Sequence, residues 1–130
     1  MRILLDTQSW LWMVSAPERL SPAARDLFES ADHELLLSVA SAWEIAIKQS
    51  IGKLKLEEPA ERFVPSRAAI FRTGSLAVEQ SHALRVAILP MHHRDPFDRL
   101  LIAQSQIEEL PILTADPVFV RYGVQIIAAA

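Results

Sequence analysis

Four carboxylates in this sequence have positions that suit the binding of a hard divalent cation. Each lies just after an apolar run or near the start of a helical pattern, and they are Asp6, Glu44, Asp98 and Asp116. When several carboxylates point into one pocket, their mutual repulsion raises some of their pKa values unless a cation neutralises them. Mg²⁺ or Mn²⁺ fits this set best, because hard cations prefer carboxylate oxygens and water, and no cluster of His or Cys residues indicates zinc.

A metal site of this kind suits the hydrolysis of phosphodiesters. A divalent cation activates water for attack and neutralises the charge that develops on the phosphorane-like transition state. This chemistry predicts a nucleic acid substrate. The net charge of −3 provides no overall attraction to a polyanion, so a local basic surface or metal ions must hold it.

Helix capping is the simpler explanation for each acid taken singly. The patterns concerned are the capping box Ser41-Ala42-Trp43-Glu44, the Asp N-cap with Pro at N1 in Asp95-Pro96-Phe97-Asp98, and Asp116-Pro117. Asp6 fits capping less well, because Thr7 or Ser9 could cap the segment that follows it. A charge directly after a buried apolar strand is also costly without a counter-ion. Capping therefore does not explain the whole set.

Short apolar runs alternate with segments of helical spacing, which predicts an α/β fold. The expected strands are Arg2–Leu5, Glu34–Ser38, Leu76–Val78, Pro111–Leu113 and Val124–Ile127. The expected helices are Ser21–Ala31, Ser41–Ile51, Pro59–Phe71, Ser81–Ile88, and one from Asp95-Pro96 that Pro111 stops. Plain apolar runs favour a mostly parallel sheet covered on both faces, so we expect a three-layer α/β/α domain. Ligands bind beyond the carboxyl ends of such strands, where the four acids would converge, but the pattern does not predict the strand order.

Length and composition limit the class of protein. The 130 residues, half of them hydrophobic, predict a single globular domain over residues 1–130. No apolar stretch approaches the ~20 residues that cross a bilayer, so we expect no membrane association. The chain has no cysteine, which excludes disulfides and a Cys nucleophile and favours a reducing, cytoplasmic location.

Four motifs, in order, resemble those of a known family. They are Leu4-Leu5-Asp6-Thr7, the segment Ser38-Val39-Ala40-Ser41-Ala42-Trp43-Glu44-Ile45, the segment from His93 to Gln104, and Leu113-Thr114-Ala115-Asp116. The sequence resembles the PIN-domain ribonucleases, and most closely the toxin subunits of VapBC-type toxin–antitoxin pairs. The resemblance covers essentially the whole chain. It implies an α/β/α fold, Mg²⁺- or Mn²⁺-dependent endoribonuclease activity, a homodimer, and inhibition by an antitoxin whose tail lies across the active site.

The resemblance also implies an acidic pocket that matches Asp6, Glu44, Asp98 and Asp116. Asp98, rather than Asp95, matches the family's metal-site aspartate, so we interpret Asp95 as the helix N-cap. Our hypothesis is that Asp6 and Asp98 hold the first ion and that Glu44 orients or deprotonates a water. Asp116 would complete this site or a second one. Attack by external water predicts 5′-phosphate and 3′-hydroxyl ends, and the number of ions stays open.

Several further residues are candidates for contact with RNA. They are Arg99, Lys48, Thr7 and Thr114. Arg99 lies beside the proposed metal site and is expected to steer RNA, whereas Lys48 could instead pair with Glu44 at i,i+4 for only about 0.2–0.5 kcal/mol. The two threonines could contact metal-bound water or cap helices.

Aromatic residues and histidines have plainer expected roles. Trp43 is expected to be buried with Ala46 and Ile47. Trp10 and Trp12 cannot share one helix face, so one of them is expected at a surface contact with another copy or the antitoxin. The adjacent pair His92 and His93 is expected to face solvent.

Three other functions remain open. A receiver module has a similar length and an acidic Mg²⁺ site, but here no acidic pair follows the first strand and no lysine follows Lys55. A phosphohydrolase with an Asp nucleophile would need a second Asp where Gln8 stands. A catalytically silent binding module with the same fold is the remaining alternative.

Overall fold

The central feature of the computed structural model, which describes residues 1–130, is a five-stranded sheet. Its strands are β1 (Arg2–Leu5), β2 (Glu34–Ser38), β3 (Thr73–Leu76), β4 (Ile112–Thr114) and β5 (Ile126–Ala128). They lie in the order β3-β2-β1-β4-β5, and every neighbouring pair is parallel. Since parallel strands end at the same edge of a sheet, the residues that follow β1, β2 and β4 meet at one place.

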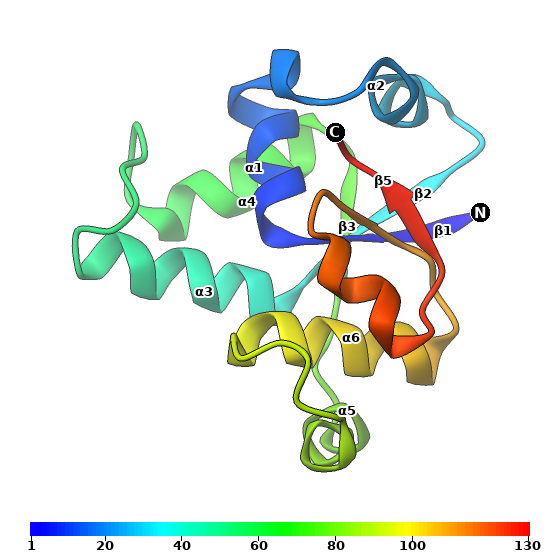
Figure 1. The fold of residues 1–130 in the computed structure, drawn as a ribbon. Helices are drawn as coiled ribbons and strands as arrows, with labels where there is room; N and C mark the ends of the chain where they lie inside the picture. The colour runs from blue at the N-terminus through cyan, green and yellow to red at the C-terminus, as the bar shows by residue number, and fades with distance from the viewer.

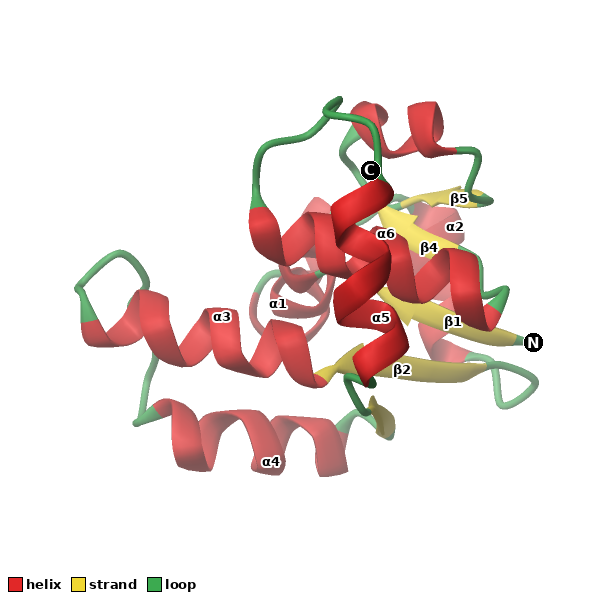
Figure 2. Cartoon of the chain, turned by 90° about the horizontal axis from the view of Figure 1, so that it is seen from below, coloured by secondary structure: helices red, strands yellow, loops and turns green.

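Helices cover both faces of the sheet, which confirms the expected α/β/α architecture (Figure 1). The α-helices are α1 (Thr7–Ser15), α2 (Pro22–Glu29), α3 (Val39–Ser50), α4 (Ala60–Ile70), α5 (Gln80–Arg85) and α6 (Pro96–Glu108). Short 3₁₀ turns are η1 (Pro17–Arg19), η2 (Val86–Ile88) and η3 (Pro117–Tyr122). Viewed from below, α5 and α6 lie in front of the strands, with α3 and α4 beside them (Figure 2). None of the helices has the length and apolar composition needed to cross a lipid bilayer.

Alternate residues of the central strands pack into two separate cores. Leu37 packs on the side of α1 and α4 with Trp10 and Phe63, while Leu36 packs on the other side with Leu101 of α6. Both sets are almost fully buried, and each buried leucine contributes ~1.5–3 kcal/mol. This burial on both faces explains why the strands are continuous apolar runs.

The edge strand and the first helix differ from the sequence prediction. β3 runs over Thr73–Leu76, where we expected Leu76–Val78, because this edge strand is only partly buried and so lacks an apolar run. Helix α1 was not predicted, since the segment Trp10–Val14 is apolar throughout and shows no helical period. Within it, Trp10 is fully buried and Trp12 is partly exposed, as the spacing of the two tryptophans required.

The buried face of α3 is also different from the predicted one. Its buried residues are Ala40, Ser41, Glu44 and Ile45. Trp43 is 59% exposed and packs edge-to-face on Phe97, so the prediction that it is buried was wrong. The prediction failed because two polar residues, Ser41 and Glu44, lie on the inward face with Ala40 and Ile45, which leaves Trp43 on the outward face.

Candidate metal centre

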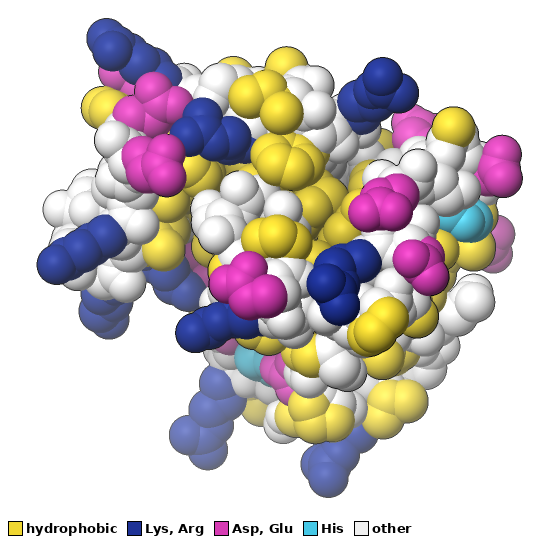
Figure 3. All heavy atoms as spheres, turned by 90° about the horizontal axis from the view of Figure 1, so that it is seen from above, with side chains coloured by type: hydrophobic (Ala, Val, Ile, Leu, Met, Phe, Trp, Pro, Cys, Tyr) yellow, Lys and Arg dark blue, Asp and Glu magenta, His cyan; other side chains and the backbone are white.

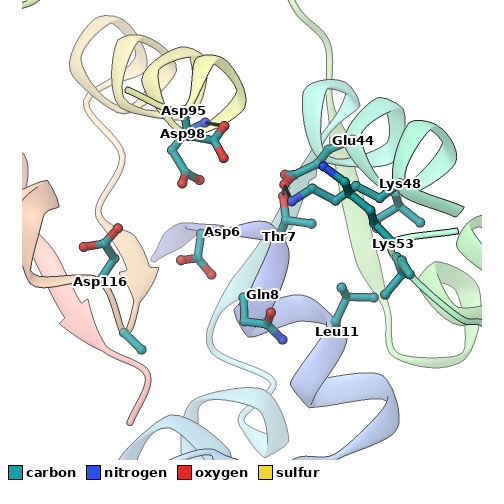
Figure 4. A pocket seen from close by; sticks show the side chains of 13 residues that line it. Asp6, Thr7, Gln8, Leu11, Glu44, Lys48, Lys53, Asp95, Asp98 and Asp116 are labelled. Carbon is teal, nitrogen blue, oxygen red and sulfur yellow. Dashed lines mark hydrogen bonds and ion pairs between the residues drawn. The ribbon is translucent and has the colours of Figure 1, made fainter. Parts of the chain in front are cut away.

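The four acids singled out in the sequence line one cavity of about 470 Å³ at the carboxyl edge of the sheet (Figure 4). Asp6 follows β1, Asp116 follows β4, Asp98 lies in the first turn of α6, and Glu44 lies in α3 after β2. Residues 18 to 110 positions apart are thus brought together by the parallel sheet. Asp95, Lys48 and Lys53 also line the cavity.

Asp6 has both carboxylate oxygens held by hydrogen bonds. Oδ1 accepts the backbone N–H of Ser9 at 2.8 Å, which makes Asp6 the N-cap of α1. The cap is therefore Asp6 itself and not Thr7 or Ser9, the two alternatives that the sequence offered. Oδ2 accepts the hydroxyl of Thr114 at 2.5 Å. Burial raises the pKa of Asp6, and the bonds from Ser9 and Thr114 oppose this rise.

Asp98 and Asp116 converge on the imidazole of His93. Nε2 of His93 lies 3.2 Å from Oδ2 of Asp98 and 2.9 Å from Oδ2 of Asp116. These three side chains offer ligand atoms within 4.8 Å of one another. Nδ1 of His93 accepts the backbone N–H of Asp95, so a neutral imidazole carries its proton on Nε2 and donates it toward the acids. The expectation that His93 faces solvent was therefore wrong.

Asp98 carries the clearest sign of crowded negative charge. Burial, which is the largest cause, and the nearby negative charges of Asp95, Asp6, Glu44 and Asp116 together raise its pKa to about 8. Asp95 caps α6, since its Oδ1 accepts the N–H groups of Phe97 and Asp98, as predicted. A set of oxygen donors that repel one another in a partly buried cavity fits a hard divalent cation.

Glu44 has hydrogen-bond and ion-pair partners that the other acids of the cavity do not share. Its Oε1 lies 2.6 Å from the hydroxyl of Thr7, and its Oε2 forms an ion pair with Lys48. The hydroxyl of Thr7 also lies 2.8 Å from Oγ of Ser41, a residue buried in α3. Ser41 is not the helix cap that the sequence suggested, because α3 begins earlier and Ser38 caps it by accepting the N–H of Ala40.

Arg99, which the sequence suggested would steer RNA, does not line the cavity. The residue is only 7% exposed, and its guanidinium donates to the carbonyls of Val86 and Pro90, both at 3.0 Å. Further acceptors are the carbonyl of His93 and the hydroxyl of Tyr122. Arg99 thus ties α6 to the segment that carries His93.

The cations that do line the cavity are Lys48 and Lys53. Figure 4 shows them on the side opposite Asp98 and Asp116. On the molecular face seen in Figure 3, acidic and basic side chains are interspersed and form no continuous basic surface. A polyanion would therefore depend on these local lysines.

Sequence reasoning missed His93 as a member of the site. Its single signal is its position five residues before Asp98, which places it in the connection that leads into α6. The structure shows that this connection folds back over Asp116.

Comparison with known proteins identifies the family to which this chain belongs. A profile of the PIN domain matches residues 3–125, and the chain belongs to the PIN domain family. Ribonuclease VapC22 of Mycobacterium tuberculosis is 30% identical over 114 residues, which cover 88% of this chain and 86% of that relative. Ribonuclease VapC16 of the same organism is 41% identical over 58 residues, which span 45% of this chain and only 41% of that protein.

Solved structures show the same fold. The VapBC2 complex of Rickettsia felis, bound to a DNA fragment from its promoter, contains a chain that matches this one with a TM-score of 0.72. The match covers 100% of both chains at 15% identity. Membership of the PIN family excludes the receiver-module alternative.

Proposed function

We propose that this protein is a metal-dependent endoribonuclease and the toxin of a VapBC-type type II toxin–antitoxin pair. The observation that carries the proposal is the convergence of Asp6, Asp98 and Asp116 on one cavity, with the pKa of Asp98 raised to about 8. The relative that covers most of the chain, VapC22, is named a ribonuclease, which supports RNA as the substrate.

Asp6, Asp98 and Asp116 would hold the ion, which is Mg²⁺ or Mn²⁺. When bound, such an ion supplies positive charge at the scissile phosphate and favours ionisation of water. Thr114 and the backbone N–H of Ser9 fix the orientation of the Asp6 carboxylate. Because the carboxylates are held before the substrate arrives, little reorganisation is needed during the reaction.

The attacking group is an external water molecule, and the products carry 5′-phosphate and 3′-hydroxyl ends. Glu44 lies on the cavity wall with Lys48 held at its Oε2. In this arrangement Glu44 orients Lys48 and the incoming water, while Lys48 contacts the RNA phosphate. Thr7 holds the other oxygen of Glu44 and so acts on the site through that residue.

The protein partner we propose is a cognate antitoxin whose tail covers the cavity. Five carboxylates in the cavity favour a basic segment as the occupant, since a cationic side chain would neutralise them as a metal ion does. We also propose a cytoplasmic location, which the lack of cysteine supports.

A homodimer is the proposed assembly, and its supporting evidence is a set of exposed apolar side chains on α3, α5, η2 and the turn that follows. They are Val39, Trp43, Leu84, Ile88 and Met91. The helices that carry them flank α6 on the side shown in Figure 2. Exposed apolar residues gathered on neighbouring elements mark a surface that a second chain can cover.

The test is cleavage of total RNA with Mg²⁺, with Mn²⁺ and with EDTA, comparing the wild type with Asp98→Asn. We expect cutting only with the metal and only by the wild type, and products without 2′,3′-cyclic phosphate. Asp26→Asn, an exposed acid on α2, is the matched control and should cut normally. A wild type that binds RNA but never cuts it would favour the silent binding module instead.

A further inference from the structure

Lys48 and Glu44 form an ion pair on the wall of the catalytic cavity. The ammonium group of Lys48 bonds Oε2 of Glu44, and the hydroxyl of Thr7 lies 2.6 Å from Oε1. Both oxygens of Glu44 therefore have a donor already. The Glu44 side chain is 6% exposed whereas that of Lys48 is 41% exposed, so the lysine covers the carboxylate and remains open to solvent.

The other acids of the cavity have no comparable partner. Asp98 and Asp116 share the single imidazole of His93, and Asp6 accepts only uncharged donors. Asp95 uses one carboxylate oxygen as the cap of α6. The cavity thus has two parts, an acidic side that lacks cations and a Glu44 side where a fixed positive charge is present (Figure 4).

We infer that the ammonium group of Lys48 takes the place of a second divalent cation, so that the site binds one ion on the side of Asp6, Asp98 and Asp116. This inference rests on the proposed nuclease function, where Lys48 provides the second positive charge at the RNA phosphate. A second divalent ion at Glu44 would have to displace Lys48 and would be repelled by its charge.

The inference separates two carboxylates that sequence reasoning placed in one ligand set. Asp98 is a direct ligand, and its loss removes the ion. Glu44 is a positioning residue for Lys48, and its loss leaves the ion in place. Ion binding measured without RNA therefore distinguishes their roles.

The experiment is a titration of the folded, metal-free protein with Mn²⁺ alone, in which electron paramagnetic resonance measures the free ion. We expect one bound ion for the wild type and two for Lys48→Met, because the freed Glu44 carboxylate can then accept a cation. Lys53→Met is the matched control, since Lys53 lines the same cavity without an ion pair to a carboxylate, and should bind one ion. Circular dichroism confirms that each variant is folded, and Lys48→Gln replaces Lys48→Met if the latter unfolds.

Two results would overturn the inference. One is a wild type that binds two Mn²⁺ ions, and the other is a Lys48 variant that binds one ion with unchanged affinity. Glu44→Gln should retain the single ion, whereas Asp98→Asn should lose it, and the reverse pattern also contradicts the assignment. Since no RNA is present, a failure of the nuclease proposal would appear in the cleavage assay and leave this stoichiometry unaffected.

Discussion

Thr114 donates its hydroxyl to Oδ2 of Asp6 at 2.5 Å, although the two residues are 108 positions apart in the chain. This bond joins the carboxyl ends of β4 and β1 at the floor of the cavity. The same hydroxyl oxygen accepts the backbone N–H of Asp116 at 3.0 Å. One buried threonine therefore orients two of the acids that we propose as ligands.

Replacing this hydroxyl should weaken both the fold and the site. We expect Thr114→Val to lower the free energy of unfolding by ~1–3 kcal/mol, because the backbone N–H of Asp116 and the Asp6 carboxylate lose a buried partner. The variant should also bind Mn²⁺ more weakly, since its Asp6 is less well oriented. Urea unfolding and calorimetric titration measure the two effects. Thr114→Ser keeps the hydroxyl and serves as the control, and equal behaviour of the two variants would refute this role.

Arg99 should prove to be structural and not a contact for RNA. We expect Arg99→Met to lower the free energy of unfolding by ~2–4 kcal/mol, because it leaves the carbonyls of Val86 and Pro90 without their charged donor. Arg94→Met removes an exposed charge from the same connection and should change stability by less than about 0.5 kcal/mol. A stable Arg99→Met protein that binds RNA poorly would restore the interpretation drawn from the sequence.

The exposed apolar side chains of α5 and η2 should lie in a dimer interface. We expect the wild type to have twice the 14.6 kDa mass of the chain in light scattering, and Leu84→Glu with Ile88→Glu to reduce it to the monomer mass. A buried charge in an apolar interface opposes association. Val120→Glu, at an equally exposed apolar position on η3, should stay dimeric. If the wild type and both variants had the same mass in light scattering, this surface would not be the dimer interface.

The sequence predicted the elements whose residues show a regular pattern. β1 and β2 have the predicted boundaries because both are buried on two faces and consist of continuous apolar runs. The convergence of the four acids followed from a general property of parallel sheets, and it is confirmed by the cavity they line. These features depend on local sequence or on topology alone.

The sequence could not predict which polar side chains are buried, because their burial depends on tertiary contacts. Glu44 occupies the inward face of α3 because Thr7 and Lys48 satisfy it there, and this turns Trp43 outward. Arg99 is buried because carbonyls of a loop surround it. The spacing did indicate the Lys48–Glu44 pair, but residue type and spacing do not indicate that Thr7 bonds Glu44 or that loop carbonyls bind Arg99.

The raised pKa of Asp98 makes the stability of the metal-free protein dependent on pH. The pKa of the Asp98 carboxyl is 3.8 in the unfolded chain and about 8 in the folded protein. Between these values the folded protein holds a proton that the unfolded chain has released. The free energy of unfolding therefore falls as the pH rises from about 4 to about 8, by at most about 1.4 kcal/mol per pH unit from this group.

Asp98→Asn should remove this dependence. In the presence of a chelator we expect the wild type to become less stable from pH 5 to pH 8, while the variant changes less and is the more stable of the two at pH 8. A smaller slope of the same sign should remain, because the pKa of Asp6 is raised as well. Urea unfolding at several pH values measures the slopes. Parallel curves for the two proteins would mean that Asp98 ionises normally in the fold.

Binding of the ion should release the proton that Asp98 holds. Below pH 8 the ion competes with this proton, so the affinity for Mn²⁺ should fall about tenfold for each unit of pH. Calorimetric titration at pH 7 in two buffers of different ionisation enthalpy should show about one proton released per ion. Glu44→Gln should release the same number, because Glu44 is paired with Lys48 and does not hold the ion. A wild type whose heat of binding is the same in both buffers would contradict the participation of a protonated Asp98.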